Sequence, residues 1–172
     1  MSDSTATARP QLAKLQEKIG VYAALTAAIM AALAAIASLM TARYSGRATS
    51  ELVRASNYWN YYQAKSLKSY ILISEREILG ALGKPQKPDA AAKLKTLEAE
   101  KQEIKAKAEL CTANSESNAG LSHLLADAVT LFQIAIANAA LAALVKRIGF
   151  WVVGLGFAAG GVGLFVSFFL HL

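Results

Sequence analysis

The chain is poor in residues that interrupt helices and in residues that crosslink a fold. It has three prolines among 172 residues, and none of them lies between residues 11 and 82. Because proline lacks a backbone N–H and breaks helix interiors, that stretch can form one long helix. Cys111 is the only cysteine, which excludes an intrachain disulfide, and the two histidines form no metal-binding motif. We therefore expect a helical protein with no metal site and no cofactor.

Charge is missing from three long segments. Residues 19–42 are 24 consecutive uncharged positions, residues 129–145 are 17 and residues 148–172 are 25, with only Lys146 and Arg147 separating the last two. A helix needs about 20 apolar residues to cross a hydrocarbon core of roughly 30 Å. The first segment is longer than the apolar region of a cleaved signal peptide, about 7–15 residues. The sequence predicts an integral membrane protein with three spans, or two spans with residues 129–145 packed at the interface.

The charged residues are concentrated in the middle of the chain. Residues 43–128 hold 13 of the 18 Lys and Arg residues and 10 of the 12 Asp and Glu residues. The net charge of +6 is therefore spread thinly. It does not make the basic patch that is typical of nucleic-acid binding.

Residues 83–89 are the clearest helix breaker in the chain. Gly83 suits a helix C-terminus because glycine tolerates positive φ, and two prolines follow it. Asp89 can cap the next helix with its carboxylate. The flanking segments, residues 47–82 and 89–127, have nearly equal lengths of 36 and 39 residues. This arrangement predicts an antiparallel helical hairpin.

The second arm carries a weak seven-residue repeat that indicates coiled-coil-like packing. The repeat consists of Leu97, Ile104, Cys111, Asn118, Leu125 and Phe132. Residues 114–120 are rich in Asn, Ser and Gly, so we expect a kink or short break there.

The predicted fold class is all-α: an integral membrane protein with about three transmembrane helices and a long hairpin between the first and second. The expected boundaries are a disordered tail at 1–10, an N-terminal helix and first span at 11–42, the hairpin at 43–127 with its turn at 83–89, the second span at 128–145 and the third at 148–172.

An aromatic run in the first arm is the most distinctive local motif. Its candidate interaction residues are Trp59, Tyr61, Tyr62, Gln63, Lys65 and Lys68. Aromatic rings with lysines hold single-stranded nucleic acid in some proteins, but the balanced charge of this chain disfavours that function. A packed seam at a helix–helix or subunit contact is the favoured interpretation, with recognition of another partner as the alternative.

Small and polar residues mark candidate packing sites in the apolar segments. Gly156 and Gly160 form a G-x-x-x-G pair, which lets helix backbones approach closely in lipid. Gln133 and Asn138 are expected to hydrogen-bond across helices, or to line a pore. The first segment has a comparable stripe of Ala24, Ala28, Ala32 and Ala35.

Three stretches together resemble a known family. They are residues 59–68, the 81–85 turn and residues 128–137 followed by Lys146 and Arg147. The chain is similar here to a bacterial membrane family catalogued as domain of unknown function 4337, from about residue 11 to the end. The resemblance implies a helical architecture and a membrane location, and it implies no catalytic residue.

No catalytic motif is recognisable, so we expect a protein that is not an enzyme. The favoured function is a membrane-anchored structural or interaction protein that self-associates and presents its hairpin. A small channel or an accessory subunit of a transport complex is the alternative. Expected partners are the lipid bilayer, further copies of the chain and an unidentified protein, with no nucleic acid.

The expected location is the bacterial inner membrane, as a multi-pass protein. Three spans would place Lys14, Lys18, Lys146 and Arg147 on one side and Arg43, Arg47 and Arg54 on the other. The positive-inside rule then favours an extracytoplasmic hairpin.

Overall fold

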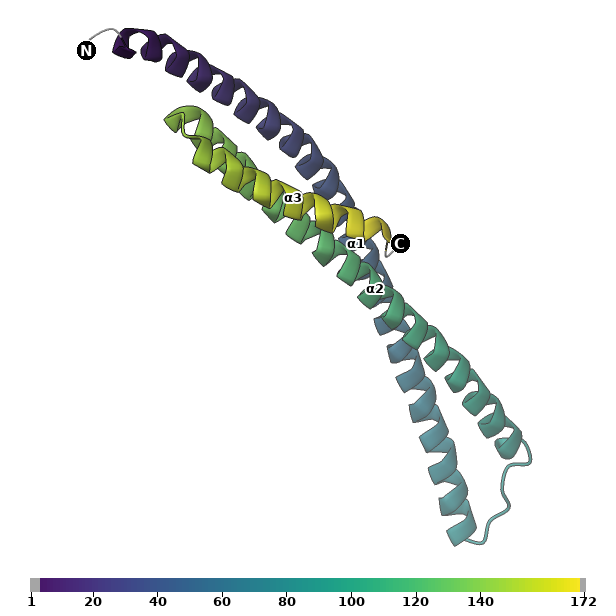
Figure 1. The fold of residues 1–172 in the computed structure, drawn as a ribbon. Helices are drawn as coiled ribbons and strands as arrows, with labels where there is room; N and C mark the ends of the chain where they lie inside the picture. The colour runs from purple at the N-terminus through teal and green to yellow at the C-terminus, as the bar shows by residue number, and fades with distance from the viewer. Residues whose placement is uncertain (1–3, 171–172) are drawn as a thin grey trace. The chain divides into compact units, whose positions relative to one another are not determined.

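The computed structural model describes residues 4–170, and the side chains from residue 18 onward. The chain forms three helices, α1 (Ser4–Ala81), α2 (Ala90–Val145) and α3 (Ile148–Leu170) (Figure 1). Helices α1 and α2 pack antiparallel, and so do α2 and α3. The all-α class and the antiparallel hairpin are therefore confirmed. Helix α1 begins at Ser4, so residues 4–10, expected as a disordered tail, are helical, while 1–3 lie outside the described residues.

The turn between α1 and α2 lies where the sequence predicts it, with Gly83 at positive φ and the carboxylate of Asp89 paired with Lys93 at 2.5 Å. Gly83 adopts φ 63°, and the N–H of Lys84 donates to the carbonyl of Leu79 at 2.9 Å, which closes the end of α1. The carbonyl of Asp89 accepts from the N–H of Lys93 at 3.0 Å at the start of α2. Gly83 and Asp89 thus lie at the two helix ends where the sequence places them.

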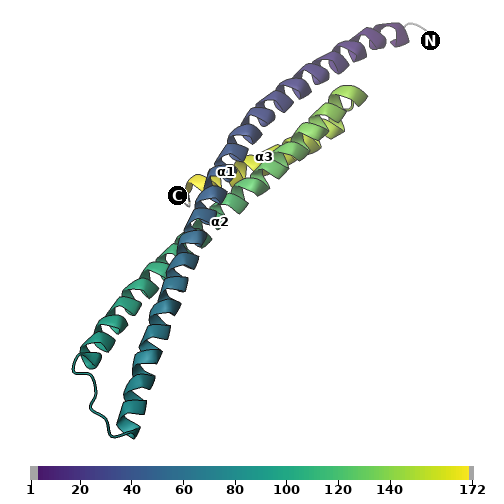
Figure 2. The same cartoon turned by 180° about the vertical axis from the view of Figure 1, so that it is seen from behind.

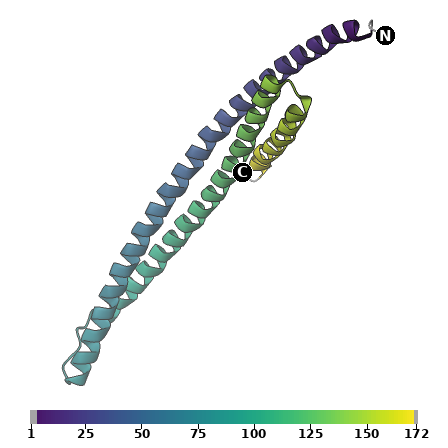
Figure 3. The ribbon, with the colours of Figure 1, turned by 90° about the vertical axis from the view of Figure 1, so that its left-hand side faces the viewer.

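Helices α2 and α3 are joined by the predicted tight turn at Lys146 and Arg147. Lys146 has φ 55°, which is unusual for a residue other than glycine. The left-handed residue reverses the chain within two positions, so α3 can return along α2 (Figure 3).

The seven-residue repeat predicted on α2 is confirmed. All six of its members are buried or half-buried. The short break expected at residues 114–120 is wrong, because α2 is helical throughout this stretch, while the alternative of a kink stays a prediction. Asn118 donates instead to the carbonyl of Asn114 at 2.7 Å, inside its own helix.

Helix α1 has a matching repeat that the sequence analysis did not identify. Ala48, Ala55, Tyr62 and Ser69 recur every seven residues, and all are buried or half-buried. Small and polar residues give this repeat little hydrophobic contrast with its surroundings, so periodicity alone does not reveal it.

The chain divides into two compact units. Unit 1 comprises Met1–Ser45 with Ala119–Leu172, and unit 2 comprises Gly46–Asn118. The core of unit 1 contains Met30, Ala34, Ala37, Ala128, Phe132, Ala135 and Ala158, so all three helices contribute to it. Unit 2 is the two-helix hairpin, whose arms lie side by side and are joined at the loop (Figure 2).

Candidate interaction surfaces

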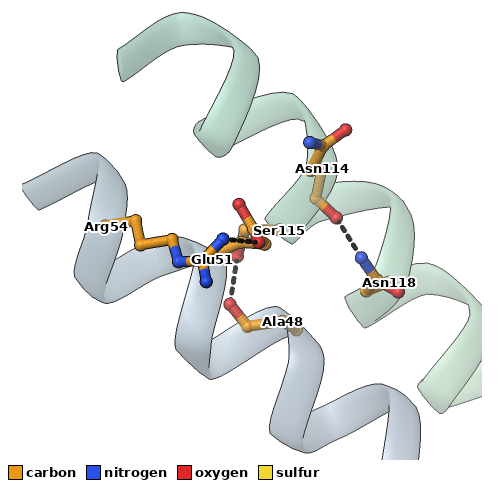
Figure 4. Close-up of polar contacts among 6 residues, drawn as sticks. All are labelled: Ala48, Glu51, Arg54, Asn114, Ser115 and Asn118. Atoms are coloured by element: carbon orange, nitrogen blue, oxygen red, sulfur yellow. Dashed lines mark hydrogen bonds and ion pairs between the residues drawn. The ribbon is translucent and has the colours of Figure 1, made fainter. Parts of the chain in front are cut away.

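The contact between the two arms of unit 2 combines small and polar side chains with the larger Ile104, which is 7% exposed on α2. Ala48 and Ala55 are buried on α1, and Ala108 is fully buried on α2. The hydroxyl of Ser115, on α2, donates to the carbonyl of Ala48 at 2.8 Å (Figure 4). Small residues at these positions let the two backbones approach, so a serine can reach the opposite helix.

Ser69 is the second buried serine of this contact. It is 6% exposed, and its hydroxyl finds no hydrogen-bond partner among the described residues. A buried polar group without a partner loses the free energy of its hydration. The contact therefore contains one stabilising serine, Ser115, and one destabilising serine, Ser69.

Charged side chains connect the arms further along. Lys65 on α1 pairs with Glu100 on α2 at 2.5 Å, and its ammonium lies 5.4 Å from the ring centroid of Tyr61. The hydrogen bond to Glu100 raises the pKa of Lys65, against the smaller opposing effect of burial. Lys101 lies 5.7 Å from the ring centroid of Tyr62 and pairs with Glu98. These lysines are engaged inside the hairpin.

The six residues of the predicted aromatic site do not form one surface. Trp59, Tyr62 and Lys65 are half-buried, whereas Tyr61, Gln63 and Lys68 are exposed. Trp59 and Tyr62 stack edge to face, with ring centroids 5.7 Å apart. The sequence motif therefore divides between the hairpin contact and the outside of α1.

Large apolar side chains of unit 2 are exposed on α1 outside this motif, as are Leu82 after α1 and Leu110 on α2. Leu67, Tyr70, Ile71 and Ile78 are each between 58% and 68% exposed. The sequence analysis missed these residues. Their spacing is a usable signal, because it repeats the 3–4 pattern of a helix contact face.

In unit 1, the glycines of α3 that contact α2 most closely are Gly154 and Gly161, which lie outside the predicted G-x-x-x-G pair. An added Cβ at Gly161 would lie 2.8 Å from two ring carbons of Phe132, and one at Gly154 would lie 3.1 Å from Cβ of Asn138. Gly156 has no neighbour within 4 Å, and Gly160 would meet only Leu131 at 3.4 Å. The role of Gly156 and Gly160 in self-association stays a prediction.

The two polar residues predicted to bond across helices behave differently from that expectation. The amide of Asn138 donates to the carbonyl of Ile134 at 2.9 Å, within α2. Gln133 is exposed on unit 1. Two other side chains of unit 1 make cross-helix bonds. The indole N–H of Trp151 donates to the hydroxyl of Thr26 at 3.2 Å, and the hydroxyl of Ser122 donates to the carbonyl of Thr41 at 3.2 Å.

The described residues offer little chemistry beyond contacts between helices. Within residues 18–170, no group of three His, Cys, Asp or Glu side chains comes together to hold a metal ion. Cys111 is half-buried in the hairpin contact, and burial, followed by a hydrogen bond to Glu51, raises the pKa of its thiol. A raised pKa lowers the thiolate fraction, so this thiol is a weak nucleophile at neutral pH.

The fold and these surfaces define an all-α chain of three long helices, each with a segment apolar and long enough to cross a membrane. The chain matches the model of the family described as "Domain of unknown function (DUF4337)" over residues 20–171, and it belongs to that family. Comparison with curated proteins and with solved structures finds no match.

Proposed function

We propose that the chain is a multi-pass membrane protein that self-associates and presents its hairpin to other proteins, without catalysing a reaction. The proposal rests on one observation. The most apolar windows of the three helices are only 6%, 28% and 22% buried inside the protein. Apolar surface left this open needs a cover, and a lipid bilayer provides one.

Unit 1 has the properties of a membrane-embedded bundle. Exposed side chains such as Leu25, Ile36 and Leu144 are apolar, and Leu144 is 79% exposed. In water each would favour aggregation, whereas in lipid each is solvated. Tyr22 and Trp151 stack with ring centroids 6.3 Å apart, as expected of aromatic residues at a membrane interface.

This stacking also supports a definite topology. It brings the start of the apolar part of α1 close to the turn between α2 and α3, so Lys18 lies at the same end of unit 1 as that turn. Three spans and the positive-inside rule then favour a cytoplasmic location for this end and an extracytoplasmic hairpin, in a bacterial inner membrane.

Cysteine labelling in intact cells tests this topology. With Cys111→Ser as background, Gln86→Cys places a thiol in the hairpin loop, and Arg147→Cys places one in the second turn. A membrane-impermeant maleimide is expected to label residue 86 in intact cells, and residue 147 only after permeabilisation. Labelling of both from the same side would refute the three-span arrangement.

Self-association is proposed through the face of α3 that carries Gly156. This residue points away from the side that contacts α2, since Gly154 and Ala158, two positions before and after it, are buried there. An open glycine on an apolar helix lets a second helix approach closely. The exposed Ala24, Ala28, Ala32 and Ala35 of α1 offer a second face of the same kind.

The particle mass in mild detergent, measured by light scattering, tests this step. Gly156→Leu is expected to lower the mass without loss of helicity, because the new side chain fills the open face. Val166→Phe is the matched control, since it adds the same number of carbon atoms at a residue that is 51% exposed. An equal fall in mass for both variants, or a parent chain that is already monomeric, would refute self-association through this face.

A further inference from the structure

The side of α1 in unit 2 that faces away from α2 carries a second repeat, in addition to the one that contacts α2. This outer stripe consists of Leu67, Ile71, Ser74 and Ile78, with Tyr70 at its edge. Successive members are separated by four, three and four residues, which is the spacing of a coiled-coil face. A shallow groove runs along it from Tyr70 to Leu79. The hairpin thus has one apolar helix face that α2 does not cover.

We propose that the outer stripe pairs with the outer stripe of a second copy of the chain, as a parallel two-stranded contact in register. The inference rests on the proposed self-association in the membrane. Two copies inserted in one membrane with the same topology carry α1 in the same direction. A contact between identical faces is then parallel.

The residue types on the outer stripe favour this geometry. In the heptad notation of coiled coils, Ile71 and Ile78 occupy position a, the first of the two core positions, and Leu67 occupies position d, the second. β-Branched residues at the first position with leucine at the second favour parallel two-stranded pairing. Ser74 would meet Ser74 of the second copy, which places one small polar layer between the apolar layers of the contact.

The edges of the outer stripe are compatible with the same arrangement. In a parallel pair, a residue at position g of one helix lies opposite the position e of the other helix that comes about five residues later in the sequence. Tyr70 would therefore face Glu75 of the second copy, whose carboxylate pairs with Lys87 of its own chain at 2.6 Å and can also accept a hydrogen bond from the phenol O–H. Gln63 would face Lys68, which forms no ion pair among the described residues. No two like charges are brought together by these pairings.

The size of the outer stripe also points to a second copy held in the same membrane. Specific contacts between freely diffusing proteins bury about 800 Å² on each partner. The outer stripe covers one face of about 12 residues, or roughly 18 Å of helix, and is smaller than that. Copies already associated through their spans have a high effective concentration at this face, so a small contact is sufficient.

Disulfide crosslinking in membranes tests the pairing on the full chain. With Cys111→Ser as background, Ile71→Cys places a thiol in the outer stripe. Ile73→Cys is the matched control, because Ile73 is 41% exposed but lies on the other side of α1. Labelling by a small maleimide establishes that both thiols react. After oxidation with copper phenanthroline, several-fold more dimer is expected for residue 71 than for residue 73.

Two results would overturn the pairing. The first is an absent or equal crosslink at residue 71, while the two thiols label equally. The second is a crosslink between differently tagged chains carrying Leu67→Cys and Ile78→Cys, which only an antiparallel pair can form. If the particle mass still reports an oligomer, only the outer stripe is refuted. If the mass is monomeric as well, the proposed self-association fails with it.

Discussion

The contacts inside unit 1 and unit 2 differ in the size of the buried side chains and in charge. Unit 1 buries Phe132 and Phe168 completely, and glycine and alanine fill the space around Phe132. Unit 2 buries alanines, two serines and Ile104, and its aromatic side chains are only half-buried or exposed. The ion pair Lys65–Glu100 connects the two arms, and the ion pair Lys87–Glu75 connects the loop to α1. Cross-helix hydrogen bonds occur in both units, so the difference lies in the fully buried aromatic rings of unit 1 and the interhelical ion pair of unit 2.

The two tryptophans allow this difference to be measured. Trp59 lies in unit 2 and Trp151 in unit 1, and the chain has no others. Trp151→Phe leaves a fluorescence reporter for the hairpin alone, and Trp59→Phe leaves one for unit 1. The unfolding transition of each variant is measured in both single-tryptophan backgrounds, in detergent.

The largest effect is expected for Phe132→Ala. In lipid or detergent the transfer of apolar surface contributes little, so the cost comes from the cavity. At about 24 cal/mol per Å³ over roughly 100 Å³, that cost is about 2 kcal/mol. The unfolding transition reported by Trp151 should move strongly. Phe157→Ala, at a residue 37% exposed, is the control and should change little. Equal effects of the two substitutions would contradict close packing as the basis of unit 1.

A smaller effect is expected for Gly161→Ala. The new Cβ would lie 2.8 Å from the buried ring of Phe132. Overpacking costs about 1–3 kcal/mol, and the higher helix propensity of alanine returns about 1 kcal/mol. Gly156→Ala meets nothing within 4 Å and should stabilise α3 by up to about 1 kcal/mol. Opposite shifts of the Trp151 transition are therefore expected, and shifts of the same sign would count against this contact between α2 and α3.

The two serines of unit 2 make a matched pair of milder changes. Ser115→Ala removes the bond to the carbonyl of Ala48 and should destabilise the hairpin by about 0.5–1.5 kcal/mol. Ser69→Ala removes a buried hydroxyl without a partner and should stabilise it by about 1 kcal/mol. The transition reported by Trp59 should move in opposite directions. Destabilisation by Ser69→Ala would mean that its hydroxyl has a partner in solution.

The smallest effect is expected from acid, and it should be confined to unit 2. Hydrogen bonds from lysines lower the pKa of Glu98 and Glu103 below the ordinary value of 4.5, and a bond from Lys93 lowers the pKa of Asp89 below 3.8. Because the pKa of each carboxyl group is lowered in the folded state, its ionised form stabilises the fold fully at any pH well above its ordinary pKa. This stabilisation is lost as the pH falls through the folded-state pKa.

The melting temperature reported by Trp59 should therefore fall below about pH 4.5, and that reported by Trp151 should not follow it. The groups are solvent-exposed, so salt should weaken the dependence. An acid transition that appears first at Trp151 would reverse the assignment of charge-dependent stability to the hairpin.

Much of the fold can be read from local sequence signals. Residues 83–89 carry their own turn chemistry, because only glycine adopts positive φ without strain and because aspartate caps a helix. The repeat on α2 is visible because Ile104, Leu125 and Phe132 are large and apolar. The corresponding repeat on α1 escapes notice, since Ala48, Ala55 and Ser69 are small. The expected break near residue 117 fails because Asn118 bonds back to its own helix.

The sequence by itself determined the three apolar segments, the two turns and the helical class. These follow from the charges, prolines and glycines of each segment, and they need no partner. Only the tertiary structure decided which side of each helix is covered. Glycine occurs on several sides of α3, and the ring of Phe132 selects Gly161 rather than Gly156 because only one of them leaves room for it. On α1, α2 contacts the small side chains and leaves the outer stripe open, since backbones approach most closely where side chains are short.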